Sequence, residues 1–122
     1  MSSFAIALQF IIALGVVNVW VIRRDRATGY RPDGAGNIAE EFARYGFSDS
    51  FRRMIGATKL LLAGLLVVGV VYSQVAVAAA AGMVLLMTGA VAAHIKVRDP
   101  LVKSVPALLM LAMSATVVLV RI

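Results

Sequence analysis

Four long apolar runs constrain the fold of this chain more than any other feature of its sequence. They cover about residues 3–22, 51–72, 74–95 and 100–121, and each is long enough for a helix to cross roughly 30 Å of hydrocarbon. Hydrophobic residues make up 61% of the chain, more than so small a soluble domain could bury. The sequence therefore predicts an all-α integral membrane protein, a four-transmembrane-helix bundle in a single domain over residues 1–122.

The charged residues indicate the topology of this bundle. Apart from Lys59 and Arg121, they all lie in two segments, 23–53 and 96–103, and the net charge is +6. Basic loops stay on the cytoplasmic side of a membrane, so we expect both segments inside, both termini outside and Arg121 alone on the outer side. The partner that this pattern predicts is the lipid bilayer of the bacterial cytoplasmic (inner) membrane, and not nucleic acid.

The first run has the features of a retained span rather than a signal peptide, because it lacks a basic start and a small-residue cleavage site. Trp20 fits an interfacial anchor. Gln9 and Asn18 fall on opposite faces of this helix, which favours two separate hydrogen bonds to other helices over one polar site. Two local features of the next segment are a stop signal of three arginines and a turn at 30–34, the arginines being Arg23, Arg24 and Arg26.

The loop over 23–50 should contain one short helix. Asn37 followed by Glu40 resembles a capping box, and Gly46 is a typical stop, so we expect a helix over 38–45. The pattern is amphipathic and predicts a cytoplasmic interfacial helix on the membrane surface or against the bundle mouth. A helix that binds a partner protein is the alternative. The expected faces are an apolar one of Ile38, Phe42 and Tyr45, and a charged one of Glu40, Glu41 and Arg44.

The second run carries a lysine within the apolar stretch. Lys59 shares a helix face with Gly56 and Ala63, which suggests that it points at a neighbouring helix. Its depth also permits the side chain to extend back to the lipid head groups. The sequence leaves both interpretations open.

The third run is rich in alanine and glycine, which places its helix at the centre of the bundle, because small residues let helices approach closely in lipid. Met83 and Met87 lie one turn apart in this run, as do Met110 and Met113 in the fourth. These flexible thioethers could line a groove for a lipid-like ligand, although filling gaps in a tight core is their commoner role.

The charged hinge between the third and fourth runs holds the only histidine, His94. Asp99 and Pro100 have the sequence of an N-cap and first helical residue, and Pro106 should then bend the last helix near its start. The alternative is a charged cluster in which Asp99 pairs with the cations around it. The residues proposed for a polar site here are Lys59, His94, Asp99 and Lys103.

Four segments of the chain resemble the DoxX-like family of small four-span bacterial membrane proteins, namely 44–47 (RYGF), 56–60 (GATKL), 89–100 (GAVAAHIKVRDP) and 103–107 (KSVPA). The family takes its name from a membrane subunit of a thiosulfate:quinone oxidoreductase. The resemblance therefore implies a redox-linked membrane role, with a quinone or another lipid as the bound ligand. It brings no catalytic residues with it.

Two classes of function follow from these observations. The first is a non-catalytic membrane subunit or scaffold that binds a quinone-like lipid or a partner protein. The second is an oligomeric transporter or channel for small solutes, in which Lys59 and His94 face the pore. An enzyme acting alone ranks third, because the chain has one histidine, no cysteine and acids only in or beside loops. The same composition makes a metal site unexpected, and a homo-oligomer or a protein partner is expected.

Overall fold

The computed structural model describes residues 3–22 and 35–122, which form helices and turns with no strand among them. The all-α prediction is confirmed for this part of the chain. Arg23, Arg24, Arg26 and the turn at 30–34 lie outside the described residues. The elements are α1 (Ser3–Val17), a π-helical turn η1 (Asn18–Ile22), α2 (Ile38–Tyr45), α3 (Asp49–Val68), α4 (Ser73–Lys96), a 3₁₀ turn η2 (Leu101–Ser104) and α5 (Val105–Arg121).

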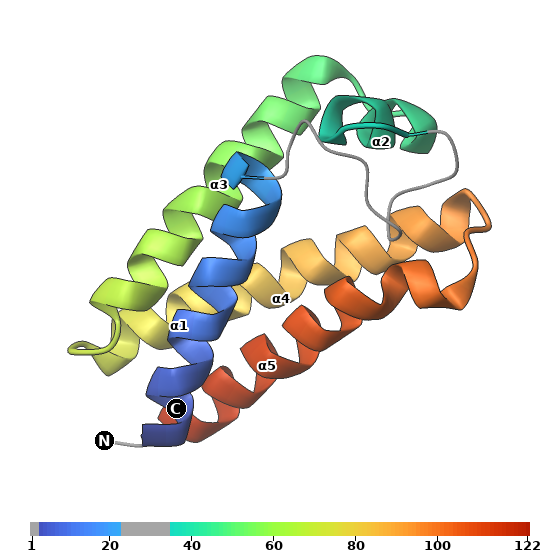
Figure 1. The fold of residues 1–122 in the computed structure, drawn as a ribbon. Helices are drawn as coiled ribbons and strands as arrows, with labels where there is room; N and C mark the ends of the chain where they lie inside the picture. The colour runs from blue at the N-terminus through green and yellow to red at the C-terminus, as the bar shows by residue number, and fades with distance from the viewer. Residues whose placement is uncertain (1–2, 23–34) are drawn as a thin grey trace.

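The long helices form two packed pairs that share one end (Figure 1). Helix α1 packs on α3, and α4 packs on α5. The short α3–α4 turn and both chain ends lie at the shared end, where α1 also meets α5. Toward the other end the two pairs separate, and α2 lies between them there. This divergence makes room for a cavity inside the molecule.

Three helical segments are long and apolar enough to cross a membrane: Ser3–Ile22, Ser73–Lys96 and Leu101–Arg121. They correspond to the first, third and fourth predicted runs, and they support a membrane location. The second run forms α3, which begins at Asp49 and ends at Val68, before the predicted boundary at residue 72. Its basic residues set it apart from the other three, so a fourth span remains a prediction. These residues are Arg52, Arg53 and Lys59.

The core lies where the two pairs meet and is built from aliphatic and small side chains that pack without charge between α1, α3, α4 and α5. Dispersion contacts of this kind stabilise helix packing in lipid. The buried residues include Leu8, Ile12, Val16, Ala63, Leu66, Ala79, Ala80, Met83 and Val117.

One buried polar group holds α1 to its neighbours. The Gln9 side chain is fully buried; its Nε2 donates to the backbone oxygen of Leu66 at 2.7 Å, and its Oε1 accepts from Arg121 at 3.3 Å. Arg121 also donates to Ser73 Oγ at 2.8 Å. The interhelical hydrogen bond predicted for Gln9 is confirmed. Arg121 of α5 bonds to Gln9 of α1 and to Ser73 at the start of α4.

The small residues of α4 serve packing on one face only. Ala76, Ala79 and Ala80 are buried, whereas Ala78 and Ala81 are exposed. The closest approach is at the α3–α4 turn, where a Cβ built on Gly69 would lie 2.7 Å from the backbone nitrogen of Ala76. The predicted close packing of this helix is therefore found against α3 and α5, and not around its whole circumference.

Helix α2 has the predicted bounds. The Asn37 side chain accepts from the backbone N–H of Glu40 at 2.8 Å, and Glu40 in turn accepts from the N–H of Gly36. At the other end Gly46 has φ 85°, and the N–H of Phe47 donates to the oxygen of Phe42. The Asn37–Glu40 and Phe47–Phe42 bonds satisfy backbone groups in the first and last turns that a short helix leaves unpaired.

The α4–α5 connection also begins with a left-handed residue, but not a glycine. Arg98 has φ 57°, and its N–H donates to the oxygen of Ile95. The N–H of Asp99 donates to the oxygen of His94, which completes a Schellman motif. This motif turns the Asp99 side chain back over the last turn of α4.

Two predictions for this hinge are wrong. Asp99 is not an N-cap: the 3₁₀ turn η2 follows Pro100, and no side chain caps it. Pro106 does not bend a helix interior, because α5 begins only at Val105 and Pro106 lies in its first turn, where a missing N–H costs little. The Schellman motif and the 3₁₀ turn delay the start of α5 and so account for both errors.

Replacing Arg98 by glycine is expected to stabilise the protein. An L-residue in the left-handed region costs about 1–2 kcal/mol, while glycine loses roughly 0.5–1 kcal/mol more chain entropy on folding. The expected net gain is about 0.5–1 kcal/mol, measured as a higher melting temperature in detergent by circular dichroism.

The matched control is Gly46→Ala, which makes the opposite change at the left-handed residue after α2. It should lower the melting temperature. If Arg98→Gly lowers the melting temperature as well, the left-handed conformation of Arg98 does not destabilise the protein.

Candidate functional site

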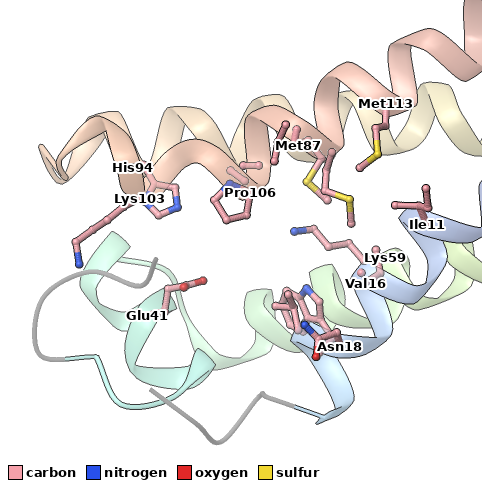
Figure 2. Close-up of a pocket in the computed structure, with 17 residues that line it drawn as sticks. Ile11, Val16, Asn18, Glu41, Lys59, Met87, His94, Lys103, Pro106 and Met113 are labelled. Atoms are coloured by element: carbon pink, nitrogen blue, oxygen red, sulfur yellow. The ribbon is translucent and has the colours of Figure 1, made fainter. Parts of the chain in front are cut away.

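A cavity of about 540 Å³ lies between the diverging helix pairs. This volume is in the range of small-molecule binding sites. Every described helix contributes to its lining, and Figure 2 shows Glu41, His94 and Lys103 toward the α2 end, with Lys59 beside Met87 and Met113 further along the cavity. The polar lining residues are Asn18, Glu41, Lys59, His94 and Lys103, and the apolar ones include Ile11, Val16, Met87, Leu109, Met110 and Met113.

The π-helical turn η1 brings the end of α1 into the cavity wall. Its wider backbone spacing is often found at functional sites, and Asn18, Val19 and Trp20 all line the cavity. Asn18 was expected to bond to another helix as Gln9 does, but its place is in this wall. No residue pattern in this segment predicts the π-helical turn.

Lys59 points into the cavity from α3 (Figure 2), and it is only 8% exposed. Its Nζ lies 5.4 Å from the centroid of the Trp20 ring, a cation–π distance. The ring fits because Gly56 has no side chain: a Cβ there would lie 2.5 Å from Trp20 Cε3. Lys59 is thus buried in the bundle, and the interpretation that it extends to the head groups is wrong.

Trp20 is also placed differently from the prediction. It is buried and packs edge-on against Phe42 of α2, with ring centroids 5.5 Å apart. Its role in the described structure is to form a platform beneath Lys59 and to join α1 with α2. An interfacial anchor exposed to head groups is not what the structure has.

Glu41 lies on the inward side of α2, whereas the sequence pattern placed it outside the apolar face. At 100° per residue, position 41 lies 60° from position 38, so the side chain borders the apolar face. Figure 2 shows it directed toward the cavity. Its negative charge acts on Lys59, which gives the cavity charges of both signs.

His94 and Asp99 form a buried pair at the end of the cavity. His94 Nδ1 lies 2.7 Å from Asp99 Oδ2, and the two side chains are 9% and 7% exposed. The Tyr45 hydroxyl lies 3.2 Å from Nε2 and 3.4 Å from Nδ1 of the same ring. Of the two interpretations of Asp99, the cap is wrong, and the carboxylate instead pairs with His94.

Further contacts hold α2 against the end of α4. Lys96 Nζ donates to the backbone oxygen of Tyr45 at 2.9 Å and lies 5.3 Å from the centroid of the Phe47 ring. The Lys96 bond satisfies a carbonyl at the C-terminal end of α2 with a cation. The Tyr45–His94 contact joins the same two helices. The α2 wall of the cavity is therefore attached to the same turn of α4 that carries His94.

A comparison with protein families decides the kind of protein. The model of the DoxX-like family matches residues 34–117. The chain belongs to the DoxX-like family. The match spans α2, α3, α4 and most of α5 of this DoxX-like protein, and so includes Glu41, Lys59 and His94. No curated protein and no solved structure matched the chain significantly.

The proposed polar cluster of this DoxX-like protein is divided by the cavity wall. Lys59, His94 and Lys103 line the cavity, whereas Asp99 stands behind His94. Two further polar residues near this cluster, Glu41 and Tyr45, were not predicted. Position 41 is three residues from Ile38 and four from Tyr45, a helical spacing that predicts a place beside the apolar face. Tyr45 was assigned to that apolar face, and its hydroxyl was not considered as a polar group.

The four methionines of the proposed groove serve two purposes. Met87, Met110 and Met113 line the cavity, while Met83 is fully buried in the core. Met110 also fills the space beside Gly15, where a Cβ would lie 2.7 Å from Met110 Cε. In this DoxX-like fold the thioethers thus form an apolar wall continuous with the core.

The acidic and histidine side chains of the described residues do not gather as metal ligands do. No group of three or more His, Cys, Asp or Glu residues in these ranges could hold a metal ion. The chemistry that the cavity offers is therefore hydrogen bonding and charge from lysine, histidine and glutamate. The apolar remainder offers dispersion contacts.

Proposed function

We propose that this protein is a non-catalytic membrane subunit or scaffold that binds a quinone-like lipid in its central cavity. One observation carries the proposal: the cavity is amphiphilic, with Glu41 and His94 at the α2 end and the Lys59 ammonium beside a wall of methionines and aliphatic residues (Figure 2). A ligand with a polar ring and an apolar chain matches this division.

The polar end supplies what a ring oxygen needs. The ammonium of Lys59 has three N–H donors and is held over Trp20, so it can donate to a ligand oxygen while the indole packs beside it. Lys103 and His94 lie on the opposite side of the cavity. A planar head group in the cavity would meet the Lys59 donor on one side and the His94 imidazole on the other.

The cavity wall reaches the outer surface of the bundle between η1 and α5. Val19 on η1 and Leu109 on α5 line the cavity and are 39% and 58% exposed. Exposed aliphatic residues at a cavity rim suit contact with lipid. In our proposal the ligand chain passes between α1 and α5 into the bilayer.

The proposal includes a placement in the membrane. Helix α3 serves as the fourth span, the α2 end faces the cytoplasm and both termini face outward, in the inner membrane of a bacterium. The basic residues near the α2 end, Arg52, Arg53 and Lys96 among them, favour this orientation. The polar head of the ligand then lies near the cytoplasmic surface, within reach of a partner protein.

Binding can be measured through Trp20, the only tryptophan of the chain. A quinone ring in the cavity should quench its fluorescence on contact. We expect saturable quenching when decylbenzoquinone is titrated into the protein in nanodiscs, against free tryptophan in nanodiscs as the reference for non-specific quenching. Quenching that rises linearly without saturation contradicts the proposal.

A pair of variants tests the role of the cavity charge. Lys59→Met removes the buried ammonium, and a hydrogen bond to a charged group is worth about 1.5–3 kcal/mol, so the dissociation constant should rise roughly tenfold or more. Arg53→Met is the control, because Arg53 is exposed and lies outside the cavity. Equal dissociation constants in the two variants would place the ligand elsewhere.

A further inference from the structure

We infer that His94 makes the cavity selective for a head group that bears a hydroxyl, such as a hydroquinone or a phenol, over one that has carbonyl oxygens alone. The inference rests on the proposed function and specifies its ligand class. The juxtaposition behind it is the imidazole of His94 in the cavity wall with the Asp99 carboxylate behind it.

The Asp99 carboxylate sets the tautomer of the imidazole. Carboxylate oxygens accept hydrogen bonds, and Oδ2 lies 2.7 Å from His94 Nδ1. The proton of the neutral ring must therefore be on Nδ1, as in other sites where a buried acid orients a histidine. Nε2 then carries a lone pair and acts as an acceptor.

The Tyr45 hydroxyl does not occupy this lone pair. It lies at similar distances from both ring nitrogens, 3.2 and 3.4 Å. An in-plane oxygen at these distances would collide with Cε1, the atom between the nitrogens. The hydroxyl consequently lies over the ring face, in keeping with the 75° angle between the two rings. The in-plane direction from Nε2 is separate from this contact.

Nε2 is the ring nitrogen that can serve a ligand. His94 lines the cavity, whereas Asp99 and Tyr45 do not. Since the two nitrogens of an imidazole point in widely different directions, fixing Nδ1 on the Asp99 side turns Nε2 away from the α4–α5 turn. A ligand in the cavity therefore meets an acceptor at this position.

The other charged groups around His94 are compatible with a hydroxyl. Glu41 on α2 is a second acceptor in the cavity wall and Lys59 brings donors from α3, whereas the Lys103 ammonium on η2 is directed away from the cavity (Figure 2). Lys96 on the same helix is bonded to the Tyr45 backbone. A hydroxyl can donate to Nε2 and accept from an ammonium at once, whereas a carbonyl can only accept and leaves Nε2 unpaired.

The test compares three ligands of nearly equal size: decylhydroquinone, its dimethyl ether and decylbenzoquinone. Their dissociation constants are measured by isothermal titration calorimetry with the full-length protein in nanodiscs, anaerobically, with empty nanodiscs as the reference. We expect the hydroquinone to bind about tenfold more tightly than the other two. The dimethyl ether keeps both oxygens but replaces each hydroxyl proton by a methyl group, whereas the quinone loses the protons without added bulk, so weaker binding of both assigns the preference to the donor.

Asp99→Asn adds a test of the tautomer. An asparagine amide can donate to Nδ1 and so favour the tautomer with its proton on Nε2, which turns the acceptor into a donor. The preference for the hydroquinone should then fall to about onefold or reverse. Asp49→Asn is the control, because Asp49 is an exposed acid in a surface ion pair, and it should keep the wild-type preference.

The outcomes separate the two proposals. If none of the three ligands binds, the proposed function fails. If they bind wild-type protein with equal affinity, the proposed function stands and the hydroxyl selectivity is wrong. If folded Asp99→Asn keeps the full preference, His94 is not its source. Should this variant fail to fold, the ligand series on wild-type protein decides alone.

Discussion

Replacing Asp99 by alanine is expected to lower the stability of the protein by about 1.5–3 kcal/mol, because the buried His94 N–H loses its hydrogen bond to a charged acceptor. The Asp99 side chain is 7% exposed, and its partner His94 is 9% exposed. Without the carboxylate, Nδ1 of His94 is left without its acceptor in a site that water hardly reaches. The measurement is reversible unfolding in mixed micelles, followed by circular dichroism.

Asp49→Ala provides the control for this prediction. Asp49 also pairs with basic residues, but on the surface: its Oδ1 lies 2.6 Å from Arg52, and its side chain is 56% exposed. Exposed ion pairs contribute little, so this variant should unfold like the wild type. Equal losses in the two variants would mean that burial of the His94–Asp99 pair does not matter for stability.

A double-mutant cycle identifies the partner of Asp99. If the pair is the source of the loss, Asp99→Ala and His94→Ala together should cost less than the sum of the single changes, with a coupling of at least about 1 kcal/mol. If the two losses of unfolding free energy are additive, Asp99 stabilises the turn independently of His94.

Replacing Gly69 by alanine is expected to cost about 1–3 kcal/mol, the usual penalty for overpacking a tight contact. The backbone of Gly69 is right-handed, with φ −64° and ψ −10°, so alanine fits the local conformation. The added Cβ would lie 2.7 Å from both Cα and N of Ala76. Backbone atoms cannot rotate away as a side chain can, so α3 and α4 must separate at their turn.

Gly64→Ala is the matched control on the same helix. A Cβ at Gly64 meets nothing within 4 Å, and alanine is favoured over glycine in a helix by up to about 1 kcal/mol. The two substitutions should therefore shift the melting temperature in opposite directions. A loss at both positions would show that glycine is required by the helix and not by the contact with α4.

The parts of the fold that depend on near neighbours in sequence were predicted well. The bounds of α2 follow from Asn37 and Gly46, which each act on backbone groups within four residues. The positions of α1, α4 and α5 follow from apolar runs in the same way, although α1 passes into η1 at Asn18 and α5 begins only at Val105. These signals are local, so one sequence is enough to read them.

The site was harder to predict because its members meet through tertiary contacts. The burial of Lys59 depends on Trp20, a residue of a different helix, and on the space that Gly56 leaves for the indole. The sequence could place Lys59 on an inward face but not supply its neighbour. Both interpretations of this lysine were consistent with the sequence for that reason.

The hinge was misread because two local rules competed there. Asp99 before Pro100 is a common helix start, while a Schellman motif is usually recognised by its glycine. Here the left-handed position is Arg98, so the sequence favoured the cap. The structure instead uses the turn to bring Asp99 back to His94, five positions earlier in the chain.

The short length of helix α2 determines how the α2 end of the cavity unfolds. An isolated helix of eight residues is not stable in water, so α2 depends on its attachments to Phe47, His94 and Lys96. Glu41 has a fixed position only while these attachments hold. The amides of α2 should thus exchange with solvent in step with those of the last turn of α4, as one cooperative unit. The α2 end of the cavity should then fold and unfold in a single step.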